Sequence, residues 1–531
     1  MSENDDRALD YAEIEKELAA FEAEERKRLG IEEEKVQHWH DANPQNFTRE
    51  EREHTTILLG GLTLAHDTLV TGALSGLGYN VQALDCPDLE ALRLGKEFGN
   101  RGQCNPTYFT VGNLVKTLSH LRDKQGMSTV DVIKKYVFLT AGACGPCRFG
   151  TYVTEYRKAL VDSGFEGFRV LLFQQQGGVK QATGEAAGLE LTPAFFKGVL
   201  QAILAGDVLN LIGYRIRPYE VTKGDTDVAL AECRTLLREI LRTRGSVITA
   251  LLKCRSRLNK IVVDRLRPKP KVSIIGEFWA MTTEGDGNHR LQRFLEQEGA
   301  EVDIQPVTAW ILYMIWEHQH DTRKRLTLRA EDEGIMGLKG KDGPTKLAML
   351  WGAEKIVRAL FAVYAKAIGL HGYHLPDMDQ VASISHQYYD NHLRGGEGHM
   401  EVGKLINTVQ HRKAHMVVSV KPFGCMPSSG VSDGIQSLIT ARYPEAIFTA
   451  IETTGDGEVN VQSRIQMDLF KARRKAEEEY QAALGRSGLE QAALAEKMRR
   501  KAKAIHHPPH VVAGTAANQV LELAGIGEWT A

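Results

Sequence analysis

The chain has 531 residues, of which 43% are hydrophobic and 25% are charged, and its formal net charge is -2 at pH 7. A single hydrophobic core stops growing at about 250–300 residues, so this length predicts two or three domains. The balanced charge and the lack of a basic, aromatic-rich stretch argue against a nucleic-acid partner. The chain opens on an acidic segment without a secretory signal, and no apolar run reaches the roughly 20 residues that cross a bilayer, so we expect a cytoplasmic protein without a membrane partner.

Two charged segments with helical periodicity flank a central α/β region. Residues 1–52 form an acidic arm, in which residues 1–35 carry 13 Asp and Glu against 6 Lys and Arg. Residues 469–531 form a basic helical arm and tail, in which residues 470–504 carry 10 Lys and Arg against 5 Asp and Glu. We interpret both arms as solvated helices, and the alternative is that they pair with each other or with a partner.

The central region repeats a pattern of strand, helix, glycine turn and strand. The first copy comprises residues 55–61, 64–77 and 78–85, and the second comprises residues 272–279, 289–298 and 299–307. Strands connected in this way form parallel sheets with right-handed crossovers, so we predict an α/β fold with two parallel-sheet halves. A basic, proline-containing stretch at residues 265–271 marks the boundary between a first lobe, 53–268, and a second lobe, 269–468.

Each half brings cysteine to the end of a predicted strand. In the first half, the apolar run 136–141 leads to Cys144-Gly-Pro-Cys147, and in the second, the run that starts at His415 leads to Cys425. Cys104 adds a fourth thiol, in a polar turn before a helix-like stretch. Because α/β proteins place their chemistry at the carboxyl ends of parallel strands, we expect both sheet edges to face one cleft.

The Cys-Gly-Pro-Cys pair has two functional interpretations. It is the pair found in thioredoxins, but a long α/β stretch precedes it, and Thr192-Pro193 indicates a helix start and not the proline loop that docks against a redox disulfide. Together with Cys104 and Cys425, the pair supplies the four thiolates of a 4Fe-4S cluster. Structural zinc uses the same ligands, although the wide spacing disfavours a compact zinc knuckle. Cys233 and Cys254 lie in helix-like stretches and are predicted to be ordinary core or surface cysteines.

Five sequence strings carry a family resemblance. They are NRGQCNPTYFTVGN (residues 100–113), ACGPCRFGTY (143–152), NHLRGGEGHMEVGK (391–404), KPFGCMPS (421–428) and IETTGDGEVN (451–460). With them the chain resembles, over residues 54–468, the 2-hydroxyacyl-CoA dehydratase and double-cubane-cluster superfamily, in particular the cysteine-bearing region of acyl-CoA dehydratase activase-related proteins. The resemblance implies two flavodoxin-like or Rossmann-like lobes around a 4Fe-4S or double-cubane cluster, with Cys104, Cys144, Cys147 and Cys425 as ligands.

The resemblance also implies a role in low-potential electron transfer. In that superfamily an ASKHA-type ATPase injects an electron into the cluster protein, and the ATPase would be a separate partner here because the chain has no phosphate-binding loop of either common type. Dehydratase members use three cysteines and leave one iron open to an acyl-CoA substrate, whereas this chain offers four. We therefore expect it to accept or relay electrons to an acyl-CoA or another reducible acceptor. The alternatives are an acyl-CoA dehydratase-type enzyme with an open iron and a non-catalytic interaction subunit with structural zinc. A homo-oligomer is a further candidate assembly.

Polar residues near the predicted strand ends are candidates for supporting the cluster. Arg394, Glu397 and His399 lie in a glycine-rich turn that suits an anionic ligand or gating of the cluster, with a helix start as the alternative. Glu452 follows an apolar run and is a candidate for proton transfer or for capping. The tract His506-His-Pro-Pro-His510 is predicted to be a disordered surface segment.

Overall fold

A computed structural model describes residues 47–142, 147–174, 188–327, 342–393, 396–501 and 503–527, together with a few positions between 18 and 29. The chain divides into two compact units, Met1–Asn43 and Pro44–Ala531. In the first unit, the described side chains of Leu18, Phe21 and Leu29 are exposed. All of the helices and strands below belong to the second unit.

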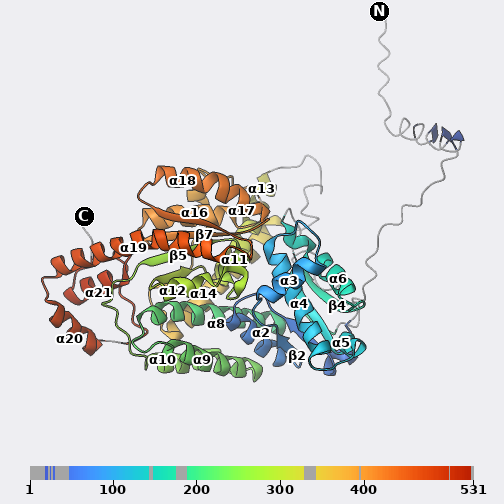
Figure 1. Cartoon of the computed structure of the whole chain (residues 1–531), viewed down its shortest axis with the longest axis horizontal. Coiled ribbons are helices and arrows are strands. Elements are labelled where there is room, and N and C mark those ends of the chain that lie inside the picture. Colours follow the sequence, from blue (N-terminus) through green and yellow to red (C-terminus); the bar gives the residue numbers. More distant parts are fainter. Residues whose placement is uncertain are drawn as a thin grey trace, which may run out of the picture. The chain divides into compact units, whose positions relative to one another are not determined.

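Two four-stranded parallel sheets form the framework of the second unit (Figure 1). The first sheet has the order β2-β1-β3-β4, with β1 (Thr56–Leu59), β2 (Asn80–Ala83), β3 (Tyr136–Gly142) and β4 (Arg169–Gln174). The second has the order β6-β5-β7-β8, with β5 (Lys271–Gly276), β6 (Glu301–Ile304), β7 (Met416–Pro422) and β8 (Ile447–Thr453). The two orders are the same, and the predicted α/β fold of two parallel-sheet lobes is confirmed.

The central strand β7 shows why the second sheet forms. All seven of its residues are buried, as expected for an apolar parallel strand with a neighbour on each side and helices on its faces. In register, Met416 lies between Val272 of β5 and Ile447 of β8. The carboxyl ends of β5 and β7 are therefore adjacent, at the position where the strand order reverses and where such sheets bind ligands.

The helices of the first lobe position its cysteines. They are α2 (Leu64–Ser75), α3 (Leu89–Phe98), α4 (Asn105–Asp123), α5 (Thr129–Lys135) and α6 (Tyr152–Asp162). Helices α3 and α4 pack backbone against backbone, because a Cβ atom at Gly112 would lie 1.8 Å from the carbonyl oxygen of Ala91. This close packing fixes the start of α4, which Cys104 immediately precedes.

Three helices between β4 and β5 in the sequence form a helical layer that packs against both lobes. It contains α8 (Pro193–Ile216), α9 (Asp225–Arg242) and α10 (Val247–Leu258). Contrary to the sequence prediction, the segment Pro193–Tyr219 is long and apolar enough to cross a membrane, but 56% of its most apolar window is buried inside the protein. It packs against α2, α9, β6 and α14 (Gly343–Ile368), so α8 is a core helix.

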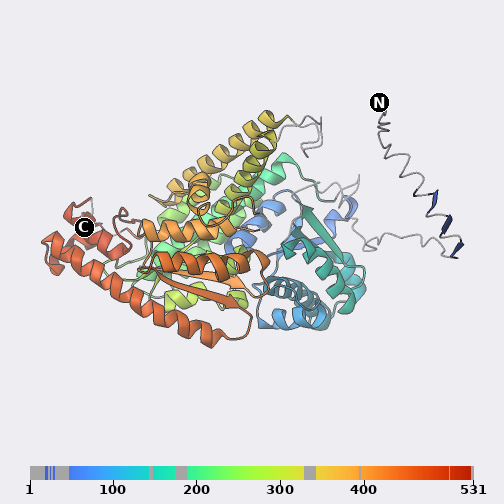
Figure 2. The same ribbon diagram turned by 90° about the horizontal axis from the view of Figure 1, so that it is seen from above.

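The remaining helices belong to the second half of the chain. They are α11 (Phe278–Thr282), α12 (Leu291–Gln297), α13 (Val307–Thr327), α14, α15 (Met378–Ser385), α16 (Gly398–Gln410), α17 (Met426–Gly430), α18 (Gln436–Arg442), α19 (Glu458–Ser487), α20 (Gln491–Lys501) and α21 (Thr515–Ala524). Helices α13 and α14 pack side by side and are seen as a pair of yellow helices in Figure 2.

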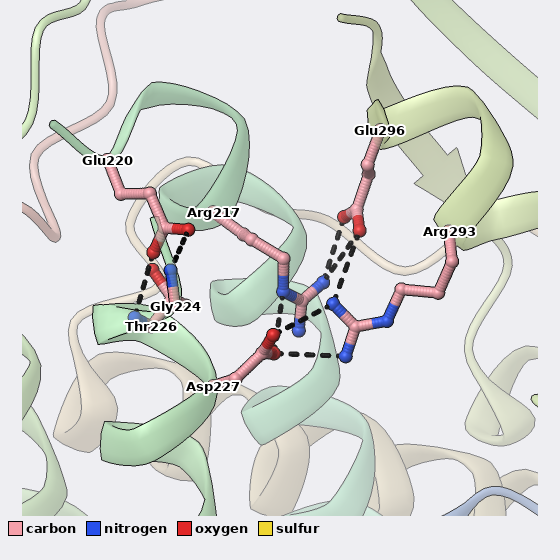
Figure 3. A network of polar contacts seen from close by, with 7 residues as sticks. All are labelled: Arg217, Glu220, Gly224, Thr226, Asp227, Arg293 and Glu296. Atoms are coloured by element: carbon pink, nitrogen blue, oxygen red, sulfur yellow. Dashed lines mark hydrogen bonds and ion pairs between the residues drawn. The ribbon is translucent and has the colours of Figure 1, made fainter. Parts of the chain in front are cut away.

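Charged side chains join the helical layer to the second lobe (Figure 3). Arg217, after α8, contacts Asp227 of α9 at 2.9 Å and Glu296 of α12 at 2.8 Å. Arg293 of α12 makes a second contact with Asp227, also at 2.9 Å, and Glu220 caps the start of α9. Because Arg217 and Glu296 are largely shielded from water, each needs the other to remain charged.

A second, fully buried contact joins α2, α8 and α13. Asp207 of α8 accepts hydrogen bonds from the backbone N–H groups of Val307 and Thr308, at 2.8 and 2.7 Å, and so caps the start of α13. The same carboxylate lies 3.2 Å from Nε2 of His66 on α2. Burial lowers the pKa of His66, but the hydrogen bond and charge of Asp207, together with the charges of Asp67 and Glu284, raise it by more, so that the pKa lies above its ordinary value. The two lobes therefore share one core.

The C-terminal histidine tract does not match its predicted disorder. His507 is packed against Glu301 at 3.8 Å, and His506 is paired with Glu522 of α21 at 2.8 Å. Glu301 also accepts hydrogen bonds from the hydroxyl groups of Tyr219 and Thr515, at 2.9 and 2.6 Å. The tract therefore anchors the C-terminal helices to the edge strand β6.

Candidate metal centre

Cys104 lies at the contact between the two lobes. Its side chain is 6% exposed, and the hydroxyl groups of Thr107 and Tyr152 lie 3.1 and 3.2 Å from its sulfur. The next residue, Asn105, donates its backbone N–H to the carbonyl oxygen of Phe423 in the second lobe, at 2.9 Å. The turn that carries Cys104 is therefore hydrogen-bonded to the loop that follows β7.

That loop carries Cys425, which is 7% exposed and directly precedes α17. Gly424 has φ +73°, and a Cβ atom there would lie 3.2 Å from both Cα of Cys104 and the carbonyl oxygen of Gln103. A glycine at this position thus allows the two cysteine-bearing loops, one from each lobe, to pack directly against each other.

Cys147 follows the third strand of the first sheet. It begins a short 3-10 turn, Arg148–Thr151, and its sulfur accepts a hydrogen bond from the backbone N–H of Phe149 at 3.5 Å. The ring of Phe149 packs edge-on against the ring of Tyr152 at a centroid distance of 5.1 Å, and the hydroxyl of Tyr152 lies 3.2 Å from the sulfur of Cys104. Cys104, Cys147 and Cys425 thus lie on loops that come together at one junction, whereas Cys144 is outside the described residues.

Three carboxyl groups of the second lobe surround this junction. Glu277 directly follows β5, where its side chain accepts a hydrogen bond from the N–H of Ala280 at 2.8 Å. Glu397 precedes α16 and accepts from the N–H of Phe278. Glu401, one turn further along α16, accepts from the hydroxyl of Ser428 at 3.0 Å, and its other oxygen is buried without a hydrogen-bond partner.

Shielding from water sets the protonation state of the site. Burial raises the pKa of the Cys147 thiol to about 11, and it likewise raises the pKa of Cys425, with Glu277 adding to both. Burial also raises the pKa of Glu397 to about 8, helped by the charge of Glu277, and raises the pKa of Glu277 and Glu401. The thiols of Cys147 and Cys425 and the carboxyl group of Glu397 are therefore mainly protonated at neutral pH.

Among the described residues, no group of three or more His, Cys, Asp and Glu side chains is arranged to hold a metal ion. Structural zinc and a 4Fe-4S cluster both use four ligands, and Cys144 is outside the described residues.

The supporting residues predicted from the sequence have different positions. Glu397 is part of the site. His399 packs against the rings of both Tyr313 and Trp316, at centroid distances of 4.7 and 4.8 Å, and its Nε2 is buried without a hydrogen-bond partner among the described residues. Glu452 is an exposed residue paired with Lys421 at 3.5 Å. Arg394 is outside the described residues.

Comparison with known proteins does not assign a family. No family model matches the chain, and no curated protein matches it. The resemblance drawn from the five strings therefore stands as an expectation.

Sequence analysis missed several residues of this site. Glu277 was included in a predicted strand, although a carboxylate directly after the apolar run Val272–Gly276 is a signal of a strand end at a binding edge. Tyr152, Thr107 and Ser428 lie within the strings that carry the resemblance, but nothing in their spacing indicates that their hydroxyl groups face sulfur or carboxylate.

Proposed function

We propose that the chain is a cytoplasmic iron–sulfur protein that accepts or relays low-potential electrons supplied by a separate ASKHA-type ATPase. The cluster, a 4Fe-4S or double-cubane centre, would be held by Cys104, Cys144, Cys147 and Cys425. The observation that carries this proposal is the meeting of Cys104, Cys147 and Cys425, from loops of both lobes, at one shielded junction.

The chemistry of the donors fits such a centre. Iron–sulfur clusters are held by thiolates, and they accept and release single electrons. Metal binding releases the thiol protons, which burial otherwise retains on Cys147 and Cys425.

The polar groups around the thiols have a role of their own. The N–H of Phe149 donates a hydrogen bond to the sulfur of Cys147, and the hydroxyl groups of Thr107 and Tyr152 lie within hydrogen-bonding distance of the Cys104 sulfur. Hydrogen bonds donated to a thiolate stabilise it and tune the potential of a cluster. The protonated state of Glu397 and Glu401 keeps further negative charge away from the thiolates.

Iron and acid-labile sulfide, counted per chain after anaerobic purification, test the proposal. We expect brown protein with both elements, and loss of iron in Cys104→Ser, Cys147→Ser and Cys425→Ser. Cys254→Ala is the matched control, because Cys254 is a buried cysteine of α10 away from the junction. Colourless protein that contains zinc would refute the proposal, and full iron in Cys425→Ser would refute a centre shared by the two lobes.

Electron flow is tested with an ASKHA-type activator and a reductant. Bleaching of the cluster should require ATP and fail with a non-hydrolysable analogue, because the chain has no phosphate-binding loop of its own. Dehydration of a 2-hydroxyacyl-CoA would instead indicate an open iron and therefore the enzyme alternative.

A further inference from the structure

Helix α14 has an apolar stripe on its solvent-exposed side. Met349, Ile356 and Val363 recur at intervals of seven residues and are 67%, 58% and 45% exposed. Gly352 and Ala359 lie between them at the same interval, and a Cβ atom at Gly352 would meet nothing within 4 Å. Together the five residues occupy alternating a and d positions of a heptad repeat, the pattern by which one helix binds another.

The opposite side of α14 is already used by the fold. Val357, Phe361, Tyr364 and Ile368 are buried, and the helix packs against α8, α10 and α13. An amphipathic helix needs only one apolar face to join its core. The exposed stripe is therefore a second apolar face, with no partner among the described residues.

The charges beside the stripe have one sign. Lys346 and Lys355 take the e and g positions beside the stripe, Lys366 takes the next d position beyond Val363, and Lys355 extends over the ring of Trp351 at 5.6 Å. The only acidic residue in Gly343–Ile368, all of which is described, is Glu354, which is hydrogen-bonded to Arg358 within the helix. The face is thus apolar along its centre and basic along its edges.

We propose that this face of α14 docks an amphipathic helix of a partner protein whose apolar stripe is flanked by carboxylates. Lys346 and Lys355 select for opposite charge at the edges, as flanking e and g residues do in coiled coils. A second copy of α14 would bring no carboxylate to these edges, because Glu354, the only acidic residue of this described helix, is at an f position. Gly352 and Ala359 allow the partner backbone to approach closely, while Met349, Ile356 and Val363 supply the buried area.

Binding of two synthetic three-heptad peptides to the full-length protein tests this proposal. Both peptides have leucine at a and d, and they differ only in having glutamate or lysine at e and g. Fluorescence anisotropy should show that the acidic peptide binds and that the basic one does not. Replacement of Lys346 and Lys355 by glutamate should reverse this preference.

Variants of the stripe locate the binding site. Ile356→Glu removes a large side chain from the apolar seam and should weaken binding of the acidic peptide about tenfold or more. Val228→Glu is the matched control, because Val228 is 56% exposed on α9, and this variant should bind as the wild type does. Thermal melts check that both variants are folded. If Ile356→Glu is not folded, Met349→Glu serves as the second test of the stripe.

Three results would overturn the proposal. They are equal binding of the two peptides, unchanged binding by folded stripe variants, and a wild-type dimer in sedimentation that Ile356→Glu converts to a monomer. The last result would identify a second copy of the chain as the occupant. None of these measurements depends on iron content, so they are independent of the proposed function.

Discussion

Replacement of Gly424 by alanine tests the packing of the two cysteine-bearing loops. The left-handed backbone at Gly424 costs an alanine about 1–2 kcal/mol. Its Cβ would also lie 3.2 Å from Cα of Cys104 and from the oxygen of Gln103, so that the loops must separate by a few tenths of an ångström. Overpacking of this kind costs about 1–3 kcal/mol. We therefore expect Gly424→Ala to lower the free energy of unfolding by about 2–5 kcal/mol.

Gly457→Ala is the matched control for that change. Gly457 also has a left-handed backbone, with φ +87°, but a Cβ atom there meets nothing within 4 Å. It should cost only the backbone strain of about 1–2 kcal/mol. Urea denaturation measures both variants, and iron analysis should show a loss in Gly424→Ala alone. Equal destabilisation with equal iron content would refute direct packing of the loops around a shared centre.

Three further predictions concern buried charges. Asp207→Asn should lower the free energy of unfolding by about 3–5 kcal/mol. Because the pKa of His66 is raised, the wild-type pair stabilises the fold fully below pH 6.5 and loses this contribution as the pH rises through the folded pKa. Urea denaturation should show this pH dependence in the wild type and not in the variant. Burial raises the pKa of Glu401, so the folded protein loses stability as the pH rises above 4.5. Glu401→Gln should therefore be at least as stable as wild type in melts at pH 8. A large loss of stability in this variant would contradict the raised pKa. Glu301→Ala leaves the buried Tyr219 hydroxyl without its acceptor, which should lower the free energy of unfolding by about 1–3 kcal/mol. Limited proteolysis should then become faster within residues 503–527. Unchanged cleavage would show that Glu301 does not anchor this segment.

The sheets were largely predictable, because burial on both faces leaves parallel strands as short apolar runs between glycine turns. The predicted run at 55–61 contains β1, and the run at 272–279 covers all of β5 except Lys271. Strand β4 was missed, although β3, α6 and β4 repeat the order of strand, helix and strand, because the cysteine-bearing turn separates β3 from α6. The apolar length of α8 was also missed, since its few polar residues interrupt the run without making it amphipathic.

The site was predictable where it depends on topology and not where it depends on side-chain direction. Cys104, Cys147 and Cys425 follow or precede regular elements whose order places them at one edge. Contact of His507 with Glu301 joins residues that are far apart in the sequence, and composition alone indicates only a polar, proline-containing tract.

The apolar surface of α8 also matters while the chain is being made. Helix α8 ends at Ile216, but the helix α14 that covers part of it ends at Ile368. At 5–20 residues per second, a ribosome needs roughly 8–30 s for the intervening stretch of about 150 residues. During that time α8, which is apolar enough to enter a membrane, can pack only against the elements of the first lobe. The nascent chain is therefore a substrate for chaperones at this stage, and a fragment that stops before β6 would expose the same surface permanently and aggregate.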